Sequence, residues 1–317
     1  MDPQERASVC DINFEPLAYV TNYKDNSVSV INVGTNKLIE SSLDVGKGPK
    51  GICILPDASL AYVANSLDNT VSIINLKTNK VLEKIIPVGK EPFKIIAHPK
   101  ENKVYVLNYQ SEDICLIDTN SQECLLITIQ AGEDPRDMTM NPEGTHLYVT
   151  NYRARTLTVI DLVNNTALAS KPLSNLSPLG IAIAPNGQEA YLTSDQPHAV
   201  FILNLVDHSF LTEPILVGRE PGQITLTPDG KRAYVANADD DTISVIDTQS
   251  KTLITSHIRV KDKPSFIAIP PDGCRIYVAN SGSNDISVVS TVSHTVISWP
   301  ISVDRYPVEI AITPRRI

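Results

Sequence analysis

The sequence predicts an all-β fold, a seven-bladed β-propeller with four antiparallel strands per blade, and one repeated motif carries most of this prediction. The motif is first written at Tyr19-Val20-Thr21-Asn22, and each later copy starts 43 residues after the previous one. The later copies begin at Tyr62, Tyr105, Tyr148, Tyr191, Tyr234 and Tyr277. A fixed period of this length is typical of repeat architectures, and four short strands per period indicate propeller blades.

Two series of prolines keep the same step and bracket the first strand of each repeat. The first series is Pro49, Pro92, Pro135, Pro178, Pro221, Pro264 and Pro307, and the second runs from Pro56 to Pro314. In the second repeat we expect strands at residues 51–55, 60–64, 70–76 and 81–88, separated by turn-forming residues. We call these strands A to D, counted outward from the axis of the ring.

The incomplete first and last repeats predict how the ring closes. The first repeat begins at strand B, near Leu17, and the last segment, residues 307–313, is a strand A with no blade after it. The C-terminal strand should therefore complete the N-terminal blade and leave no long unpaired edge. We expect one propeller domain over residues 14–317, preceded by an N-terminal arm over residues 1–13.

Composition narrows the classes of partner. The net charge of −9 argues against nucleic acid and against an anionic membrane surface. The N-terminus lacks the pattern of a signal peptide, so we expect a cytoplasmic protein. We also expect a monomer. The five cysteines include no Cys-x-x-Cys pair and are interpreted as reduced thiols. Cys115 and Cys124 share one predicted hairpin and could lie side by side, although two small apolar fillers are the favoured interpretation.

The repeated Tyr-Val-x-Asn motif and the turns Pro228-Asp229-Gly230 and Pro271-Asp272-Gly273 resemble those of the YVTN-repeat β-propeller family. The resemblance covers about residues 16–314. It implies the propeller fold. It does not imply an activity, because the family includes surface-layer and binding proteins, and related propellers host lactonases and lyases.

Aligned columns of strand A predict the lining of the central channel, because side chains alternate along a strand. The first column is Gly51, Lys94, Asp137, Gly180, Gln223, Phe266 and Glu309. We expect its polar members, Lys94, Asp137, Gln223 and Glu309, to form a ring at one mouth. The next column, from Ile52 to Ile310, should point between blades, and the short third column should form a narrow waist. Lys94 and Asp137 either close the mouth as a salt bridge, which is favoured, or belong to a binding ring.

Departures from the repeat gather on one face, called the top, over blades 4 to 6. Blade 5 replaces the usual glycine before strand A with Ser174-Asn175-Leu176-Ser177 and the repeated asparagine with Ser194. Neighbouring loops are rich in charge. The candidate binding residues are Arg136, Asp137, Tyr152, Arg153, Arg155, Asp195, His198, Arg219, Gln223 and Asp240. The alternative is that these exposed loops have diverged in sequence without forming a binding site. The repeated tyrosines and asparagines are interpreted as structural.

The chain shows no metal-binding spacing and no nucleophile elbow. We therefore predict a non-enzymatic scaffold, without a cofactor, whose top face binds a protein or peptide partner through residues such as Arg153 and Arg155. The alternative is a metal-assisted enzyme of the lactonase or lyase kind with a small substrate at the channel mouth. Its candidate residues are Asp137, Gln223, Glu309, Asp195 and His198, with carboxylates that hold a divalent cation or act as a base. A third interpretation makes His98 the axial ligand of a cofactor, and Trp299 is expected to pack at the rim.

Overall fold

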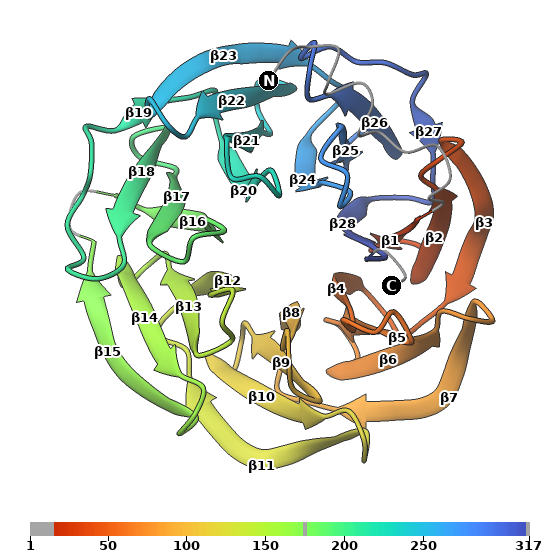
Figure 1. The fold of residues 1–317 in the computed structure, drawn as a ribbon. Coiled ribbons are helices and arrows are strands. Elements are labelled where there is room, and N and C mark those ends of the chain that lie inside the picture. The colour runs from red at the N-terminus through yellow and green to blue at the C-terminus, as the bar shows by residue number, and fades with distance from the viewer. Residues whose placement is uncertain (1–15, 174–175, 315–317) are drawn as a thin grey trace.

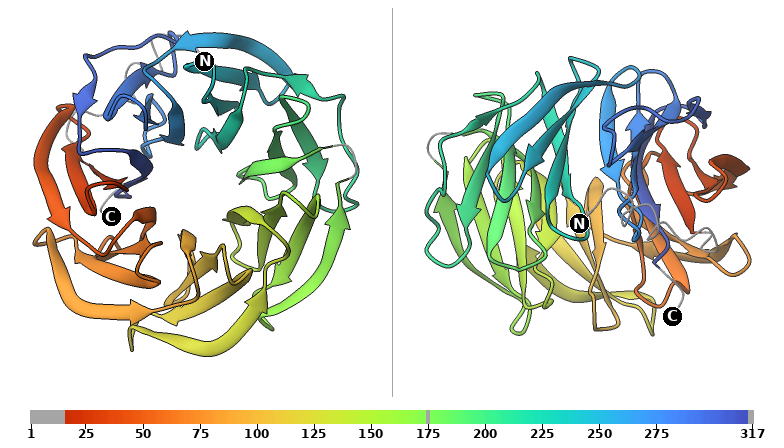
Figure 2. Two further views of the ribbon diagram at one scale, coloured as in Figure 1. Left: turned by 180° about the vertical axis from the view of Figure 1, so that it is seen from behind. Right: turned by 45° about the horizontal axis from the view of Figure 1, so that its top comes forward.

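Seven antiparallel four-stranded sheets surround a central channel in the computed structural model, which describes residues 16–173 and 176–314 (Figure 1). The predicted arm, residues 1–13, lies outside these ranges, as do Ser174 and Asn175. Figure 2 shows the ring from behind and tilted, with the sheets standing side by side around the channel. In the described ranges, no helix has the length and hydropathy to cross a membrane.

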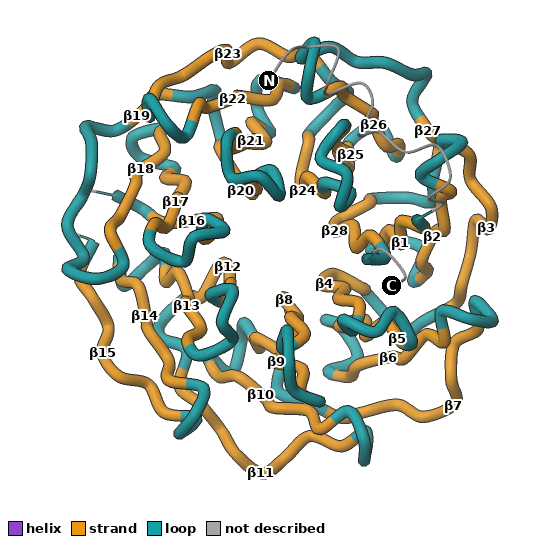
Figure 3. Tube along the Cα trace, viewed as in Figure 1, coloured by secondary structure: helices purple, strands orange, loops and turns teal. Residues whose placement is uncertain are grey.

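Each blade contributes one strand to each of four concentric positions (Figure 3). The A strands are β28 (Pro307–Ile312), β4 (Pro49–Ile54), β8 (Pro92–Ala97), β12 (Pro135–Met140), β16 (Pro178–Ile183), β20 (Pro221–Leu226) and β24 (Pro264–Ala268). The B strands are β1 (Leu17–Asn22), β5 (Leu60–Asn65), β9 (Lys103–Asn108), β13 (His146–Asn151), β17 (Glu189–Ser194), β21 (Arg232–Asn237) and β25 (Arg275–Asn280). The C strands are β2 (Ser27–Asn32), β6 (Thr70–Asn75), β10 (Asp113–Asp118), β14 (Thr156–Asp161), β18 (Ala199–Asn204), β22 (Thr242–Asp247) and β26 (Asp285–Ser290). The D strands are β3 (Lys37–Asp44), β7 (Lys80–Pro87), β11 (Glu123–Gln130), β15 (Thr166–Pro172), β19 (Ile215–Leu216), β23 (Thr252–Arg259) and β27 (Ile301–Ser302).

The C-terminal strand closes the ring, as predicted. β28 pairs antiparallel with β1, with Ala18 opposite Ile312 and Val20 opposite Ile310. The pairing gives β1 a neighbour on its inner edge, so blade 1 is built from both ends of the chain.

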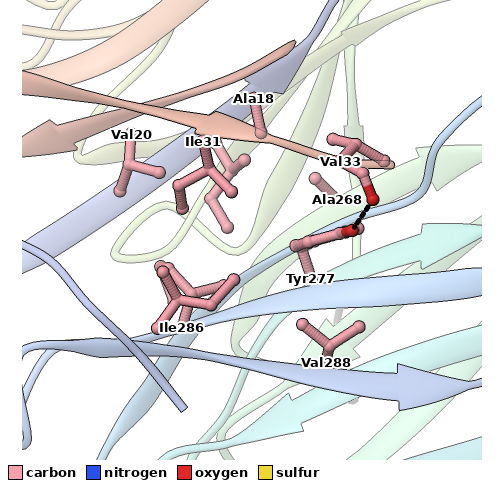
Figure 4. Close-up of a cluster of buried hydrophobic side chains, with 11 residues drawn as sticks. Ala18, Val20, Ile31, Val33, Ala268, Tyr277, Ile286 and Val288 are labelled. Atoms are coloured by element: carbon pink, nitrogen blue, oxygen red, sulfur yellow. Dashed lines mark hydrogen bonds between the residues drawn. The ribbon is translucent and has the colours of Figure 1, made fainter. Parts of the chain in front are cut away.

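The apolar core lies between blades. One cluster joins Ala18, Val20 and Ile31 of blade 1 to Tyr277 and Val288 of blade 7 (Figure 4). In Figure 4 the Tyr277 hydroxyl donates a hydrogen bond of 2.9 Å to the carbonyl of Val33 in the adjacent blade. The second column of strand A, from Ile52 to Ile310, is at most 4% exposed and packs in these seams, which confirms its predicted direction.

The repeated asparagines hold the turn that follows strand B, which confirms their structural interpretation. Asn237 is fully buried, and its Nδ2 donates to Thr242 Oγ1 at 3.1 Å and to Ser244 Oγ at 2.9 Å. The glycine before strand A of the same blade faces this amide, because a Cβ at Gly218 would lie 2.7 Å from Asn237 Nδ2. Glycine at this position leaves room for the asparagine side chain. Blade 5 lacks both residues, whereas blades 7 and 1 keep Asn280 and Asn22 with Lys261 and Asp304 in place of the glycine.

The outer strand departs from the prediction in two blades. β19 and β27 each have only two residues, so the segments before them are irregular. Trp299 lies in one such segment and is 91% exposed, so the expectation that it packs at the rim is wrong.

The cysteines also require a correction. Cys115 on β10 and Cys124 on β11 form a disulfide with 6.2 Å between their Cα atoms, a distance typical of this bond. The two residues are not opposite each other in the hairpin, where Cys115 faces Thr128 and Cys124 faces Ile117. Cys274 is disulfide-bonded as well, and Cys53 is a free buried thiol.

His98 fixes a turn on the face opposite the top and does not present a ring nitrogen to the channel. Its Nδ1 accepts hydrogen bonds from the amides of Lys100 and Glu101, at 3.1 Å and 2.8 Å. Its Nε2 lies 2.9 Å from the carbonyl oxygen of Gly144, to which it donates. Both nitrogens are engaged, so the interpretation of His98 as an axial ligand is wrong.

Gly144→Ala is expected to destabilise the protein more than Gly187→Ala, its counterpart in the next blade. Both glycines have positive φ, +78° and +70°, so each alanine costs roughly 1–3 kcal/mol of backbone strain. At Gly144 the new Cβ would also lie 2.7 Å from the His98 ring, whereas at Gly187 it meets only Glu143 Oε2 at 3.2 Å. Loss of the buried His98 hydrogen bond adds about 1–3 kcal/mol. Urea unfolding of both variants measures this difference, and equal losses would contradict it.

Candidate active site at the channel mouth

A cavity of about 750 Å³ opens at the top mouth of the channel. Two repeat columns supply most of its lining, because the strand A termini and the loops above them converge there. The column that follows the first proline series contributes every member to the wall: Lys50, Phe93, Arg136, Leu179, Gly222, Ser265 and Val308. The first column of strand A forms the floor, with the four polar side chains that were predicted to form a ring.

A buried lysine between two carboxylates occupies this floor. Lys94 Nζ lies 2.8 Å from Glu309 Oε1 and 3.6 Å from Asp137 Oδ1. The three side chains are 13%, 9% and 10% exposed, respectively. The ammonium also lies 4.7 Å from the centroid of the Phe266 ring, a favourable cation–π distance. We call Lys94, Asp137 and Glu309 the floor triad.

The members of the floor triad come from different blades, and contacts between blades hold them in place. Lys94 belongs to blade 3 and Glu309 to blade 1, and they meet because blade 2 places Gly51, which has no side chain, between them. Asp137 Oδ2 accepts the amide of Ile181 from the next blade at 3.0 Å, and Gln223 Oε1 accepts the amide of Ile267 at 3.1 Å. The predicted contact between Lys94 and Asp137 is present, and the shorter contact to Glu309 is an addition to it.

The triad has unusual proton affinities. Burial raises the pKa of the Glu309 carboxyl to about 7, against the opposing effect of Lys94. Burial lowers the pKa of the Lys94 ammonium, but Glu309 and Asp137 outweigh it and raise that pKa above its ordinary value. At neutral pH the floor therefore holds a stable cation beside a carboxyl group that exchanges its proton readily, a combination suited to acid–base chemistry.

The rim of the cavity carries further cations on aromatic platforms. Lys50 Nζ lies 5.1 Å from the Phe93 ring centroid and 5.7 Å from that of Tyr23. The Arg136 guanidinium lies 5.4 Å from the centroid of Tyr109 and 5.1 Å from that of Tyr152. Lys24 Nζ lies 4.9 Å from the Tyr306 ring centroid. Carboxylates also hold two of these cations, since Arg136 pairs with Asp134 at 3.1 Å and Lys50 pairs with Glu91 at 3.0 Å. The rim therefore presents preorganised cations that are partly neutralised by their ion pairs.

A second cavity of about 300 Å³ lies below the ring. The four ring side chains line both cavities and separate them. Short residues of the third column, such as Cys53, Thr139 and Ala182, line the lower cavity, so this column faces the channel as predicted.

The donor set of the ring does not suit a divalent cation. The Lys94 ammonium already occupies the position between the carboxylates of Asp137 and Glu309. In residues 16–173 and 176–314 there is no cluster of three or more His, Cys, Asp or Glu side chains arranged to hold a metal.

The top-face candidates do not converge on one point. Arg153 is 74% exposed with Glu133 at 3.9 Å, and Arg155 is also exposed. Arg219 forms an exposed pair with Asp240 at 2.7 Å. The Tyr152 hydroxyl donates to Asp195 at 3.0 Å, and His198 Nδ1 lies 3.9 Å from the same carboxylate. Of the ten candidates, only Arg136, Asp137 and Gln223 line the mouth cavity.

Sequence reasoning missed most of the rim. Lys50, Phe93, Tyr23, Lys24 and Tyr306 line the cavity and were not among the candidates. The sequence does hold a signal for part of the rim. The residue after each proline of the first series directly precedes the ring residue in the chain and lies at the start of strand A. The bulge that follows the proline directs this residue toward the axis as well.

Comparison with known proteins gives two partial family matches. Residues 50–164 match the model of the YNCE-like β-propeller, and residues 184–296 match that of the seven-bladed β-propeller lactonase. No curated protein sequence gives a significant match.

Solved structures share the fold at low identity. A putative 6-phosphogluconolactonase from Bacteroides uniformis is 18% identical with a TM-score of 0.80, covering 94% of this chain and 100% of the other. The periplasmic gluconolactonase from Pseudomonas aeruginosa is 15% identical with a TM-score of 0.76, at 95% and 99% coverage. A functionally unknown protein from Desulfotomaculum acetoxidans is 15% identical with a TM-score of 0.81, at 94% and 99% coverage.

These findings overturn one prediction. The interpretation of the chain as a non-enzymatic scaffold is wrong, because residues 184–296 match a lactonase model. The propeller family is supported, and the enzyme at the channel mouth, our alternative, agrees better with the matches.

Proposed function

We propose that this propeller is an enzyme that hydrolyses the ring ester of a small acidic lactone in the mouth cavity. The observation that carries the proposal is the floor triad, in which a lysine cation touches a carboxyl group whose pKa is about 7, inside an open cavity of about 750 Å³. The lactonase match over residues 184–296 supports the same reaction class, and this segment contributes Gln223 and Phe266 to the floor.

The rim favours an anionic substrate. Lys24, Lys50 and Arg136 face the cavity, and each is held on at least one aromatic ring. A carboxylate or phosphate group on the substrate would bind these cations, while the apolar ring faces contact the carbon skeleton. The lactone carbonyl would then lie at the floor, near Lys94.

The triad supplies the chemical step. Glu309, as a carboxylate, accepts a proton from water as the water oxygen attacks the lactone carbonyl carbon. The Lys94 ammonium stabilises the negative charge that forms on the carbonyl oxygen. The tetrahedral intermediate collapses by breaking the bond from carbon to the ring oxygen, and Glu309 returns its proton to that oxygen. Asp137 keeps Lys94 charged throughout, and the product is an open-chain hydroxy acid.

The direct test is hydrolysis of sugar-acid δ-lactones, with and without a phosphate group, followed in a pH-stat after subtraction of the spontaneous rate. We expect turnover of about 1–10³ s⁻¹ on the preferred lactone. Absence of turnover on every carboxylated or phosphorylated lactone would overturn the proposal.

Arg136→Gln is expected to raise KM for the acidic lactone about 10- to 150-fold, with little change in kcat, because a charge-assisted contact to the anionic group contributes about 1.5–3 kcal/mol to binding. Arg219→Gln is the matched control, since Arg219 pairs with Asp240 outside the cavity. Steady-state kinetics on both variants measure the effect. An equal rise of KM in both, or a fall in kcat alone, would contradict the role of Arg136.

A further inference from the structure

The third position of the repeated motif is not uniform. It is threonine in three blades, at Thr21, Thr150 and Thr193, and an apolar residue in the other four. The apolar members are Ala64, Leu107, Ala236 and Ala279. The fold therefore does not require a hydroxyl at this position.

Thr21 on β1 connects β28, the strand that carries Glu309, to the wall of the cavity. Its fully buried hydroxyl accepts the amide of Glu309 at 3.0 Å and donates to the carbonyl of Lys50, in the next blade, at 2.7 Å. The register between β1 and β28 shifts at this point, and the hydroxyl provides the partner for the Glu309 amide at the shift.

The same connection recurs at Thr150 and Thr193. Thr150 Oγ1 accepts the amide of Asp137 at 3.1 Å and donates to the carbonyl of Leu179 at 2.6 Å. Thr193 Oγ1 accepts the amide of Gly180 at 2.7 Å and donates to the carbonyl of Gly222 at 2.6 Å. All three hydroxyls are buried.

Both carboxylate residues of the ring, Glu309 and Asp137, have a threonine bonded to their backbone amide. Two of the three threonines hold the backbone of Glu309 and Asp137, whereas the strands of Lys94 and Gln223 face Leu107 and Ala236. The third, Thr193, holds Gly180, which has no side chain in the ring. Thr193 therefore makes the same two hydrogen bonds without a group to position.

We propose that Thr21 is a positioning residue that fixes Glu309 against Lys94, and that Thr150 does the same for Asp137. The inference rests on the proposed function and deepens it, because a carboxylate that serves as a base must keep its place relative to water and substrate. A misplacement of about 1 Å at a reacting group can cost about a hundredfold in rate.

The test compares Thr21→Val with Thr193→Val, since valine keeps the shape and removes the hydroxyl. We expect Thr21→Val to lower kcat about 10- to 100-fold with KM within about twofold, and Thr193→Val to leave kcat within about twofold. The melting temperature should fall by a similar amount in both, because both lose equivalent hydrogen bonds. Thr21→Ser keeps the hydroxyl and should restore kcat. Equal kcat in the two valine variants would overturn the proposal.

A second readout separates this inference from the proposed function. The pKa of the Glu309 carboxyl can be followed by carbon NMR on glutamate-labelled protein, with Glu309→Gln to assign the signal. Lys94 on β8 lowers this pKa, while Asp137 on β12 raises it. We expect an upward shift in Thr21→Val, because the contact to Lys94 loosens, and none in Thr193→Val. If the wild type hydrolyses no lactone, the proposed function fails, and an unchanged pKa in Thr21→Val then overturns the positioning role as well.

Discussion

Glu309→Gln is expected to lower kcat by about 10²–10⁴-fold, the usual contribution of a general base. Glutamine keeps the size of the side chain but cannot accept a proton from water. The wild-type kcat/KM should rise about tenfold per pH unit below pH 7 and level off above it, because the Glu309 carboxyl has a pKa of about 7 and acts when ionised. The variant should lose this inflection.

Glu220→Gln provides the matched control. Glu220 also lines the mouth cavity but does not contact Lys94 among the ion pairs of the described chain. Its substitution should leave kcat within a few-fold. A Glu309→Gln enzyme with near-normal kcat, or a wild-type profile without an inflection near pH 7, would remove Glu309 from the mechanism.

Lys94→Met is expected to destabilise the protein by about 3–5 kcal/mol, because removing one partner of a buried ion pair leaves the other charge uncompensated. Here two carboxylates, Asp137 and Glu309, would remain buried beside each other. Lys231→Met is the control: Lys231 pairs with Asp229 at 3.8 Å with both side chains about half exposed, and surface pairs contribute about 0–1 kcal/mol. Urea unfolding at pH 8 measures both variants.

The stability lost in Lys94→Met should increase as the pH rises. The folded-state pKa of Glu309 is raised from 4.5 to about 7, so the native state binds the proton more tightly than the unfolded state. Stability from this group is present below about pH 4.5 and is lost as pH rises through 7. Lys94 lowers this pKa, so its removal should extend the decline to higher pH and make the total loss larger. Adding Glu309→Gln to Lys94→Met should recover part of the stability, and no recovery would contradict the buried-charge explanation.

The sequence alone determined the architecture, because a propeller blade is a local unit. The constant step of 43 residues sets the number of blades, and the strand A left over at Pro307 implies closure with the first blade. Column positions such as Ile52 and Ile310 predicted which side chains lie between blades, since alternation along a strand depends on neighbours in the sequence.

Only the tertiary structure decided which side chains meet. Lys94 and Glu309 are separated by 215 residues and by a whole blade, and their contact depends on Gly51 leaving space between them. The disulfide between Cys115 and Cys124 likewise joins two residues that are not opposite each other in their hairpin, since Cys115 faces Thr128 and Cys124 faces Ile117. The ring column could be read from the repeat, but the distances across it could not. They follow from how tightly the seven A strands close around the axis, which is set by packing between blades.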